Sequence, residues 1–327
     1  MTISPFCEQD LEAVVAIWNR TARGRTLYYP LTPDKLRRLF LEKPDFDPAG
    51  FLLAQDARGI AGGVMVSAPA ASSDKRLATL YGLFDRAGHP GRYAQAALDA
   101  ALAYLEARGA TGVSTHQLAT VDSRDLSLLD FLWLNRFHHP GVYDGVIEQQ
   151  VSLNTLYLSC ELTAFHLPPE IVALEETLAA AGYTVRLVRD DAVLIPAFAA
   201  SDVPFGKEFA AILRTRSPLE YLFVACLGDE PVGGALASCP GAPTDWSNHG
   251  CSCGLFGPTG VSRKHRGGVG KVLLFRTLDC LRQLGYREAM IPIAPSILPF
   301  YRKAGARVAR VALHLQRPLG ALTLNVR

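Results

Sequence analysis

The chain has 327 residues, and at about 150 residues per domain this length predicts two domains. Hydrophobic residues make up 49% and charged residues 20%, a composition typical of a globular protein that buries a sizeable core. Because 33 basic residues nearly balance 31 acidic ones, the chain lacks the basic excess of nucleic-acid-binding proteins, and we expect no nucleic-acid partner.

The start of the chain, MTISPFCEQDLEAVV, places acidic residues where a secretory signal peptide needs a basic and then an apolar region. No run approaches about 18 uncharged apolar residues, the length that a membrane span needs. We therefore expect a cytoplasmic protein without membrane association. The 7 cysteines are scattered and odd in number, which fits a reducing compartment.

Two β-hairpins with the same pattern are predicted, one in each half of the chain. The segment FLLAQDARGIAGGVMVSAP (51–69) aligns without gaps with LFVACLGDEPVGGALASCP (222–240), and each has two apolar runs around a polar turn. The strand-like segments that follow also match, YGLF at 81–84 and CGLF at 253–256.

A helix is predicted after each of these strands. The helix after His89 aligns with the helix after His265, and leucines on one face match in the two segments. Both helices end at a glycine, Gly109 and Gly285, the residue expected where a helix stops. Because the similarities keep the same order at a nearly constant offset, we infer two copies of one domain.

The repeat predicts a domain at 1–150, a second domain at 182–327, and a connecting strand and linker helix at 151–181. The linker helix enters through Pro168-Pro169 and is closed by Gly182. Strands are mixed with helices in each copy, which predicts an α/β (α+β) fold with sheets covered by helices.

A possible metal site lies before the helix of the second copy. His249, Cys251 and Cys253 are close in sequence, but a structural zinc wants four ligands and no second cysteine pair stands at ligand spacing. On an alternating strand the two cysteines would share one face as small hydrophobic side chains. We therefore expect no metal.

The segment VSRKHRGGVGKVLL (261–274) joins a strand to an amphipathic helix through three glycines flanked by basic residues. Glycines let a backbone approach a ligand closely, and the first amides of a helix bind anions. His265 and Val272 exclude a Walker A loop, and Leu273 excludes the Gly-x-Gly-x-x-Gly dinucleotide pattern. The first copy enters its helix without these glycines, so we expect them to serve close approach to a ligand.

What remains, a strand followed by His265-x-x-Gly268-x-Gly270 and a helix, resembles the pyrophosphate loop of the GNAT (N-acetyltransferase) superfamily, where Gln or Arg takes the place of His265. An alternative alignment with one residue deleted leaves the register within the loop open by one position. Tandem GNAT proteins, such as the mycothiol synthases, have a similar arrangement. The resemblance implies two GNAT-like domains, each with a mixed, mostly antiparallel twisted sheet flanked by helices.

The resemblance also implies a site for acetyl-CoA, the acyl donor, in the second copy. The loop amides would hold the pyrophosphate, and the end of the preceding strand would pair with the pantetheine arm. The cofactor-binding residues that it implies are Thr259, Gly260, Val261, His265, Arg266, Gly267, Gly268, Val269, Gly270 and Lys271.

The segment PFYRKAGARVARV, which begins at Pro299, resembles the GNAT helix that carries a catalytic tyrosine. Tyr301 matches that tyrosine, which often protonates the leaving thiolate of coenzyme A, whereas Ala294 replaces the family's usual Asn. A phenol suits this role because its pKa near 10 keeps it protonated at neutral pH. The alternative is that Tyr301 is a buried aromatic residue that anchors the helix.

The two copies differ at these positions. Arg92 stands where the second copy has Gly268, and Leu132 stands where it has Tyr301. We therefore predict a degenerate first domain that packs against the second and helps to shape its acceptor pocket. The alternative is that the first copy still binds a cofactor, with Arg92 contacting phosphate.

The expected function is acyl-CoA-dependent N-acyl transfer, most simply of acetyl to a small-molecule amine by direct attack. The general base stays open among Asp245 and His249, with a contribution from His89, His138, His139 or the segment at 25–30 also considered. An aminoacyl transferase that uses charged tRNA is disfavoured by the near-zero net charge. The main alternative is an acyl-CoA-binding sensor or pseudoenzyme without catalysis. The oligomeric state stays open, a homodimer being one option.

Overall fold

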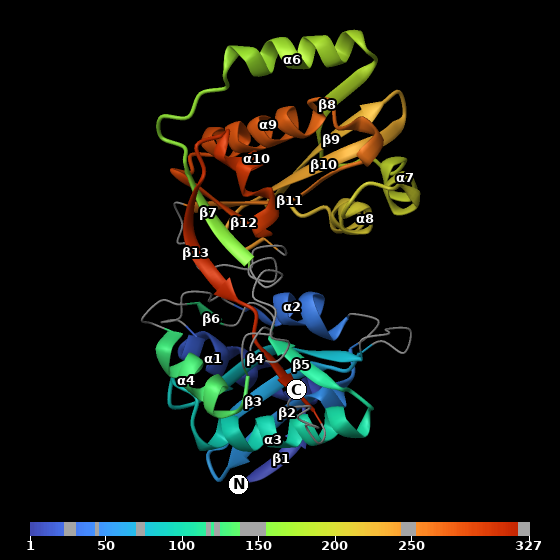
Figure 1. The fold of residues 1–327 in the computed structure, drawn as a ribbon. Coiled ribbons are helices and arrows are strands. Elements are labelled where there is room, and N and C mark those ends of the chain that lie inside the picture. Colours follow the sequence, from blue (N-terminus) through green and yellow to red (C-terminus); the bar gives the residue numbers. More distant parts are fainter. Residues whose placement is uncertain are drawn as a thin grey trace, which may run out of the picture. The chain divides into compact units, whose positions relative to one another are not determined.

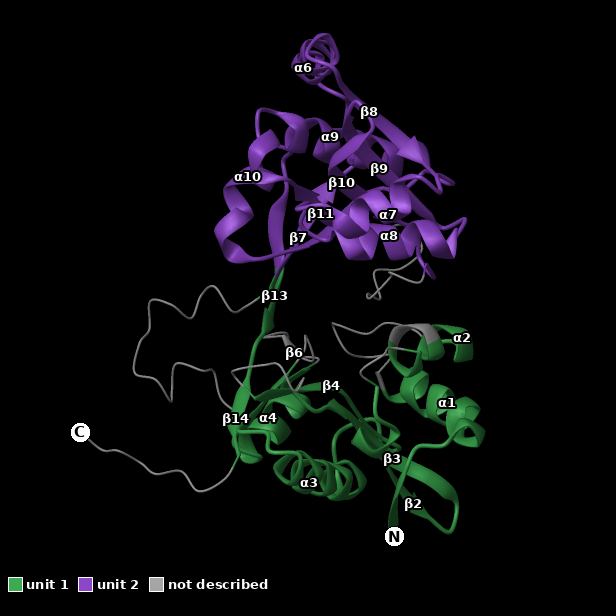
Figure 2. Ribbon diagram, turned by 90° about the vertical axis from the view of Figure 1, so that its right-hand side faces the viewer, with its two compact units in different colours: residues 1–155, 246–248, 310–327 green, residues 156–245, 249–309 purple. Residues whose placement is uncertain are grey.

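A computed structural model describes residues 1–22, 31–42, 46–69, 76–115, 119–120, 125–137, 155–242 and 253–319 (Figure 1). These residues form two compact units, coloured separately in Figure 2. Described residues up to 155 and from 310 onwards belong to the first unit, and those from 156 to 309 belong to the second. Among the described residues, no helix combines the length and the apolar character that a membrane crossing requires.

The described part of the first unit contains a sheet with the strand order β1-β2-β3-β4-β5-β14. All neighbours in it are antiparallel except β4 and β5, which are parallel. The strands are β1 (Thr2–Pro5), β2 (Phe51–Asp56), β3 (Gly59–Ser67), β4 (Leu77–Asp85), β5 (Gly112–Thr115) and β14 (Gln316–Pro318).

Helices cover both faces of this sheet, and Figure 2 shows α1 and α3 on opposite sides of its strands. One face packs against α3 (Arg92–Ala107) and α4 (Leu126–Leu134). The other packs against α1 (Leu11–Ala22), α2 (Pro33–Leu36) and the π-helical turn η2 (Arg37–Leu41). The 3-10 turns η1 (Glu8–Asp10) and η3 (Pro48–Gly50) precede α1 and β2.

In the second unit consecutive strands follow the order β7-β12-β11-β10-β9-β8. Only β11 and β12 are parallel among these pairs. The strands are β7 (Thr155–Glu161), β8 (Tyr183–Val188), β9 (Glu220–Leu227), β10 (Glu230–Ser238), β11 (Cys253–Val261) and β12 (Glu288–Ile293). The strand β13 (Arg307–Leu313) begins in the second unit and ends in the first, where it pairs with β6 (Ala119–Thr120).

The helices of the second unit also lie on both faces of its sheet. Figure 1 shows α9 (Val269–Gln283) between the strands and α6 (Pro169–Ala180), and the three layers share one apolar core. A separate core on the other face includes α7 (Leu194–Ala200) and α8 (Gly206–Thr215). The remaining turns are η5 (Arg263–His265), η6 (Pro295–Ile297) and the short helix α10 (Leu298–Arg302).

The fold class predicted from the sequence is therefore confirmed, because each unit has a mixed, mostly antiparallel sheet flanked by helices. The series β2–β3–β4–α3–β5 in the first unit corresponds to β9–β10–β11–α9–β12 in the second. Each series contains one hairpin and one parallel pair joined by a crossover helix, as expected for parallel neighbours.

Each sheet is completed by a strand from outside the copy that the repeat assigns to it. The strand β14, from the end of the chain, pairs antiparallel with β5 of the first unit. The strand β7, which follows the first copy in sequence, pairs antiparallel with β12 of the second unit. The two strands occupy equivalent places beside the parallel pair, and β14 makes the first unit discontinuous in sequence.

We expect a substitution near the end of the chain to destabilise the core of the first unit. Leu315 is 4% exposed and packs in that core, and its carbonyl accepts a hydrogen bond from the amide of Thr115 at 2.8 Å. Leu315→Ala should lower the free energy of unfolding by about 3 kcal/mol, as for other buried leucines. Val308→Ala is the control, because Val308 on β13 is 43% exposed. Equal urea midpoints for the two variants would contradict this role of Leu315.

Candidate functional site

The parallel strands β11 and β12 pair over only part of their length. Cys253, Gly254 and Leu255 pair with Glu288, Ala289 and Met290, and the pairing then stops. Both strands continue, β11 as far as Val261 and β12 as far as Ile293. Among the described residues, the peptide groups of β11 after Leu255 therefore have no strand partner on the side that faces β12.

On its other edge, β11 pairs with β10 through a register shift. Ala235 is opposite Thr259 and Ala237 is opposite Phe256, so that two residues of β11 lie across from one residue of β10. This β-bulge bends β11 at the point where it leaves β12. Bulges re-aim side chains and are common beside active sites.

Tyr301 lies on α10 and packs against this bent part of β11. It is 5% exposed, and its ring meets those of Phe256 and Phe300 edge-on at 5.9 and 5.0 Å. Burial raises the pKa of Tyr301 to about 12, and the neighbouring Thr259 hydroxyl opposes that rise. No hydrogen bond of ordinary geometry engages Thr259 Oγ1 among the described residues, although this oxygen is buried. Thr259 Oγ1 and the Tyr301 hydroxyl can therefore take a further hydrogen-bond partner.

The glycine-containing loop brings a helix N-terminus to the same place. A Cβ atom at Gly270 would contact Val261 and Phe300 at 3.5 and 3.7 Å, so α9 begins beside the end of β11 and beside α10. Among the described residues, none accepts a hydrogen bond from the amides of Gly267, Val269 or Gly270. Such amides, together with the helix dipole, form an anion-binding site.

The structure gives Gly268 a different reason from the one predicted. Its φ of +104° is one that residues with a side chain rarely adopt, and a Cβ atom there would lie 2.9 Å from Leu174 Cδ1 on α6. Backbone conformation and packing therefore require this glycine, whether or not a ligand approaches it. Gly267, by contrast, has open space where a Cβ atom would lie, so nothing within the fold explains its glycine.

The other predicted binding residues lie along the same path. Gly260 pairs with Gly234 on β10, and a Cβ atom there would lie 2.1 Å from the carbonyl oxygen of Pro204. Arg266 and Lys271 are basic residues on either side of the glycines in the sequence. Lys264 is in an ion pair with Asp202 at 3.6 Å.

His265 is held by a residue that the sequence motifs do not identify. Its Nδ1 atom lies 3.0 Å from the hydroxyl of Tyr183, and the two rings meet edge-on at 5.9 Å. Tyr183 belongs to β8, at the far end of the strand order from β12. No local pattern announces this contact, because the two residues are far apart in the sequence.

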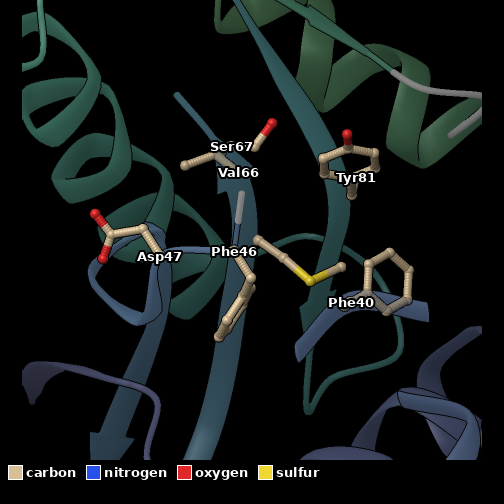
Figure 3. A pocket seen from close by; sticks show the side chains of 7 residues that line it. Phe40, Phe46, Asp47, Val66, Ser67 and Tyr81 are labelled. Carbon is tan, nitrogen blue, oxygen red and sulfur yellow. The ribbon is translucent and has the colours of Figure 1, made fainter. Parts of the chain in front are cut away.

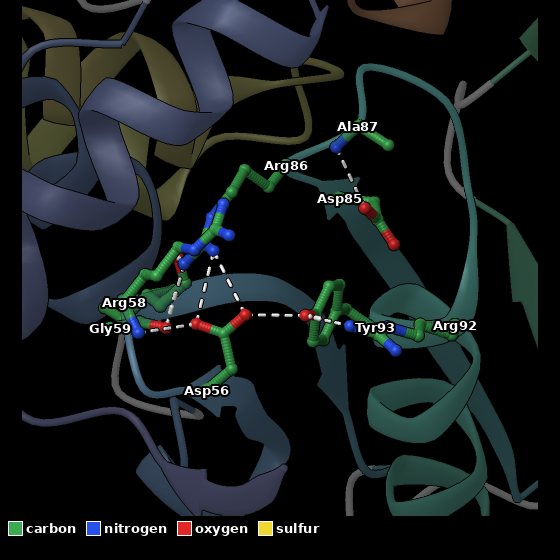
Figure 4. Close-up of polar contacts among 9 residues, drawn as sticks. Asp56, Arg58, Gly59, Asp85, Arg86, Ala87, Arg92 and Tyr93 are labelled. Carbon is green, nitrogen blue, oxygen red and sulfur yellow. Dashed lines mark hydrogen bonds and ion pairs between the residues drawn. The ribbon is translucent and has the colours of Figure 1, made fainter.

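The corresponding helix of the first unit has its anion site filled from within. The carboxylate of Asp85 accepts hydrogen bonds from the amides of Gly91 and Ala94 at 3.2 and 3.1 Å. It also accepts one from the amide of Ala87 at 3.0 Å (Figure 4). Gly91 and Ala94 align with Gly267 and Gly270, the positions whose amides are open in the second unit. Asp85 is 2% exposed, so a buried carboxylate of the chain itself occupies the place at the start of α3 where a helix N-terminus can bind an anion.

Arg92 and Tyr93 are likewise committed within the first unit. Arg92 donates to the Tyr93 hydroxyl at 2.6 Å, and this hydroxyl donates to Asp56 at 2.6 Å (Figure 4). Arg86 binds both carboxylate oxygens of Asp56 at 3.2 and 3.1 Å. The hydrogen bond from Tyr93 is the main cause that lowers the pKa of Asp56 to about 2.

Several candidates for acid–base chemistry lie outside the described residues. They are Asp245, His249, His138, His139 and the segment at 25–30, together with Cys251. His89 is described and exposed, with its Nδ1 atom 3.5 Å from the carbonyl oxygen of Pro90. Within the described ranges, no group of three or more His, Cys, Asp or Glu residues could hold a metal ion.

No protein-family model and no curated protein matches the sequence, but solved structures match nearly all of the fold. A tandem GNAT protein from the clavulanic acid biosynthesis pathway is 13% identical with a TM-score of 0.68, covering 98% of this chain and 99% of that one. A GCN5-related N-acetyltransferase from Sphaerobacter thermophilus is 14% identical with a TM-score of 0.59, covering 98% and 96%.

A further match is a GCN5-related glucosamine N-acetyltransferase region in a fungal multi-domain GH3 β-N-acetylglucosaminidase, with 16% identity and a TM-score of 0.66. It covers 97% of this chain, which spans 38% of the fungal protein. At these identities the similarity concerns the fold. The chain has the tandem GNAT fold that its sequence predicts, whereas the specific likeness to mycothiol synthases stays a prediction.

The ionised Asp56 should stabilise the first unit in a pH-dependent way. Its pKa falls from 3.8 to about 2 on folding, so its contribution is present above pH 3.8 and is lost as the pH falls through 2. Asp56→Asn should lower the melting temperature by a few degrees at pH 7, and the difference should disappear near pH 2. Asp229→Asn, in the turn of the second hairpin, is the control. A difference independent of pH would contradict the assignment.

Proposed function

Given its tandem GNAT fold, we propose that this protein is an acyl-CoA-dependent N-acetyltransferase that transfers acetyl from acetyl-CoA to a small-molecule amine. The site that we propose lies in the second unit. The observation that carries this proposal is the contrast between the two crossover helices. Asp85 fills the amides at the start of α3, whereas the equivalent amides of Gly267 and Gly270 bind no described residue.

The open amides suit the pyrophosphate of the acyl donor, because they sit at the positive end of a helix dipole. Arg266 and Lys271 add positive charge beside them. The free edge of β11 from Thr259 to Val261 suits the pantetheine arm, whose amides can pair with a strand edge as an added peptide would. The thioester would then lie near the β-bulge and Tyr301.

The proposed reaction is direct attack of the amine nitrogen on the thioester carbonyl carbon. A C–N bond forms and the C–S bond breaks, and the proton that the amine loses passes through solvent to the leaving coenzyme A thiolate, which gives an amide and the free thiol. Tyr301 stays protonated because its pKa is about 12. Thiols have a pKa of about 8.5, so this phenol is a weaker acid than the thiol product. Tyr301 therefore suits a hydrogen bond that stabilises the developing thiolate. The proton lost by the amine then neutralises this thiolate.

The first unit is less suited to bind acetyl-CoA than the second. Its anion site holds Asp85, and Leu132 takes the place of Tyr301. A second acetyl-CoA molecule would have to displace a buried carboxylate from three amides, which is costly because each such hydrogen bond involves a charge. We therefore propose one donor site for each chain. The alternative, an acyl-CoA sensor, would bind acyl-CoA at this same site but would not catalyse acyl transfer.

Isothermal titration should give one equivalent of acetyl-CoA per chain. Gly267→Asp should weaken binding about tenfold or more, because it places a carboxylate beside the amides that would hold pyrophosphate. Gly267→Ala is the matched control: the space there is open, so both variants should fold, and the excess effect of Asp isolates its charge. Two bound equivalents, or equal affinities of the two variants, would rule the proposed site out.

Tyr301→Phe should lower kcat about 100-fold with little change in KM for acetyl-CoA. The ring stays in place against Phe256 and Phe300, so the fold should be kept. In the wild type, ionisation of Tyr301 should cause no loss of rate near neutral pH, because its pKa is about 12. The assay follows release of the coenzyme A thiol with a panel of amines. If Tyr301→Phe turns over as fast as the wild type, Tyr301 has no catalytic role, whereas a wild type that binds acetyl-CoA but turns over with no amine favours the sensor.

A further inference from the structure

We propose that Thr259 is a positioning residue, which directs the Tyr301 hydroxyl at the leaving thiolate by donating a hydrogen bond to the phenol oxygen. This inference rests on the function proposed above. It gives the side chain of Thr259 a role in addition to the backbone pairing expected of that residue.

The β-bulge of β11 determines on which face of the sheet Thr259 lies. Side chains alternate between the two faces of a strand, so an extra residue reverses the alternation beyond it. Before the bulge, Gly254 faces α9, since a Cβ atom there would lie 2.6 Å from a leucine of that helix. Beyond the bulge, Gly260 faces the other way, towards Pro204. Its neighbour Thr259 therefore lies on the face of α9 and Tyr301, which share one core.

The hydroxyl of Thr259 is buried, and no described residue gives it a hydrogen bond of ordinary geometry. A buried hydroxyl without a partner costs stability, so its position needs a reason. It lies close enough to the Tyr301 phenol to oppose the rise in the pKa of that group. A hydroxyl has this effect when it donates to the phenol oxygen, since such a bond favours the ionised form. The phenol's own proton is then available for a second acceptor.

The two hydroxyls can act in series on the thiolate. Thr259 Oγ1 donates to Tyr301 Oη, and Tyr301 Oη donates to the sulfur as negative charge develops there. Each bond in such a chain polarises the next one, which strengthens the donor nearest to the charge. Catalytic hydrogen bonds are often long without a ligand and tighten in the transition state. Edge-on contacts with Phe256 and Phe300 hold the phenol ring, so the rotation of its O–H is what Thr259 sets.

The first unit has leucine in place of both hydroxyl-bearing residues. Leu132 takes the place of Tyr301 in the aligned sequences. Leu83 takes the place of Thr259 in the sheet, because each is opposite the residue that follows the Gly-Gly pair of its hairpin. Both leucines are 0% exposed and belong to the core that packs against α3. The fold therefore needs no hydroxyl at either place, and the unit with a closed anion site lacks the pair.

A pocket in the described part of the first unit lies apart from these two leucines. Its lining includes Phe40, Phe46 and Tyr81 (Figure 3), and neither Leu83 nor Leu132 contributes to it. The places of the two hydroxyls are therefore filled by core packing in this unit. The pairing of a threonine with a tyrosine belongs to the unit whose helix amides are open.

Coenzyme A itself is the probe, because its thiol can be titrated without knowledge of the acceptor amine. The full chain is loaded with coenzyme A, and the ultraviolet absorbance of the thiolate is followed with pH as a difference from the unloaded protein. In the wild type the bound thiol should ionise at a lower pH than free coenzyme A. Thr259→Val, which keeps the shape but not the hydroxyl, should raise the apparent pKa of the bound thiol by about 0.5, a threefold loss. Thr259→Ser should keep the wild-type value.

The matched control is Thr277→Val. Thr277 is 0% exposed on α9, and its hydroxyl also lacks a described partner, so this variant removes a comparable hydroxyl outside the proposed site. It should titrate as the wild type does, and both valine variants should melt within a few degrees of it. In a Tyr301→Phe background, Thr259→Val should have no further effect, because it acts through the phenol.

The proposal is overturned if Thr259→Val titrates as Thr277→Val does. It is also overturned if the effect of Thr259→Val persists in the Tyr301→Phe background, since Thr259 would then act on the thiolate directly. Failure of coenzyme A to bind the wild type would be a different result, because it would overturn the proposed function and this inference with it.

Discussion

A helix leaves its first amide groups without acceptors inside the helix, and these groups must find partners elsewhere. The two crossover helices of this chain meet that constraint in opposite ways. At α3 a buried carboxylate, Asp85, accepts from the amides of Gly91 and Ala94. At α9 no described residue accepts from the corresponding amides of Gly267 and Gly270. The division of labour that we propose between the units follows from this difference, since one anion site is satisfied and the other is available.

The surroundings of α9 fit the same interpretation. The strand that leads into the loop separates from its parallel neighbour after Leu255, and its β-bulge brings Thr259 towards Tyr301. The raised pKa of Tyr301 changes the role expected from a simple phenol. Such a group donates a hydrogen bond over the whole accessible pH range, but it is a poor source of a free proton. Preorganised donors of this kind act by stabilising charge as it develops.

Local patterns in the sequence predicted much of this molecule. Alternation and helical periodicity located the hairpins and the helices after them, and the repeat of these signals predicted the tandem fold. The motif around Gly268 located the helix N-terminus, but it did not reveal the additional reason for Gly268, because its φ of +104° and its contact with Leu174 depend on how the chain packs. The sequence does carry a local signal for Asp85, because an acidic residue follows Phe84 where glycine follows Phe256. The contact of Tyr183 with His265 and the pairing of β14 with β5 had none, since they join distant segments.

The late position of β14 in the sequence also affects when the first sheet can be completed during synthesis. The amide of Leu315 donates to the side chain of Thr115 across 200 positions of sequence, so the first sheet gains β14 only after the whole second unit has been synthesised. Until then β5 presents an unpaired edge, the kind of surface on which chains aggregate. The second sheet has the opposite history, because β7 is already available when its own strands emerge. A nascent chain of this protein therefore holds its first half unfinished for the longest time, and that half has the greater need of a chaperone.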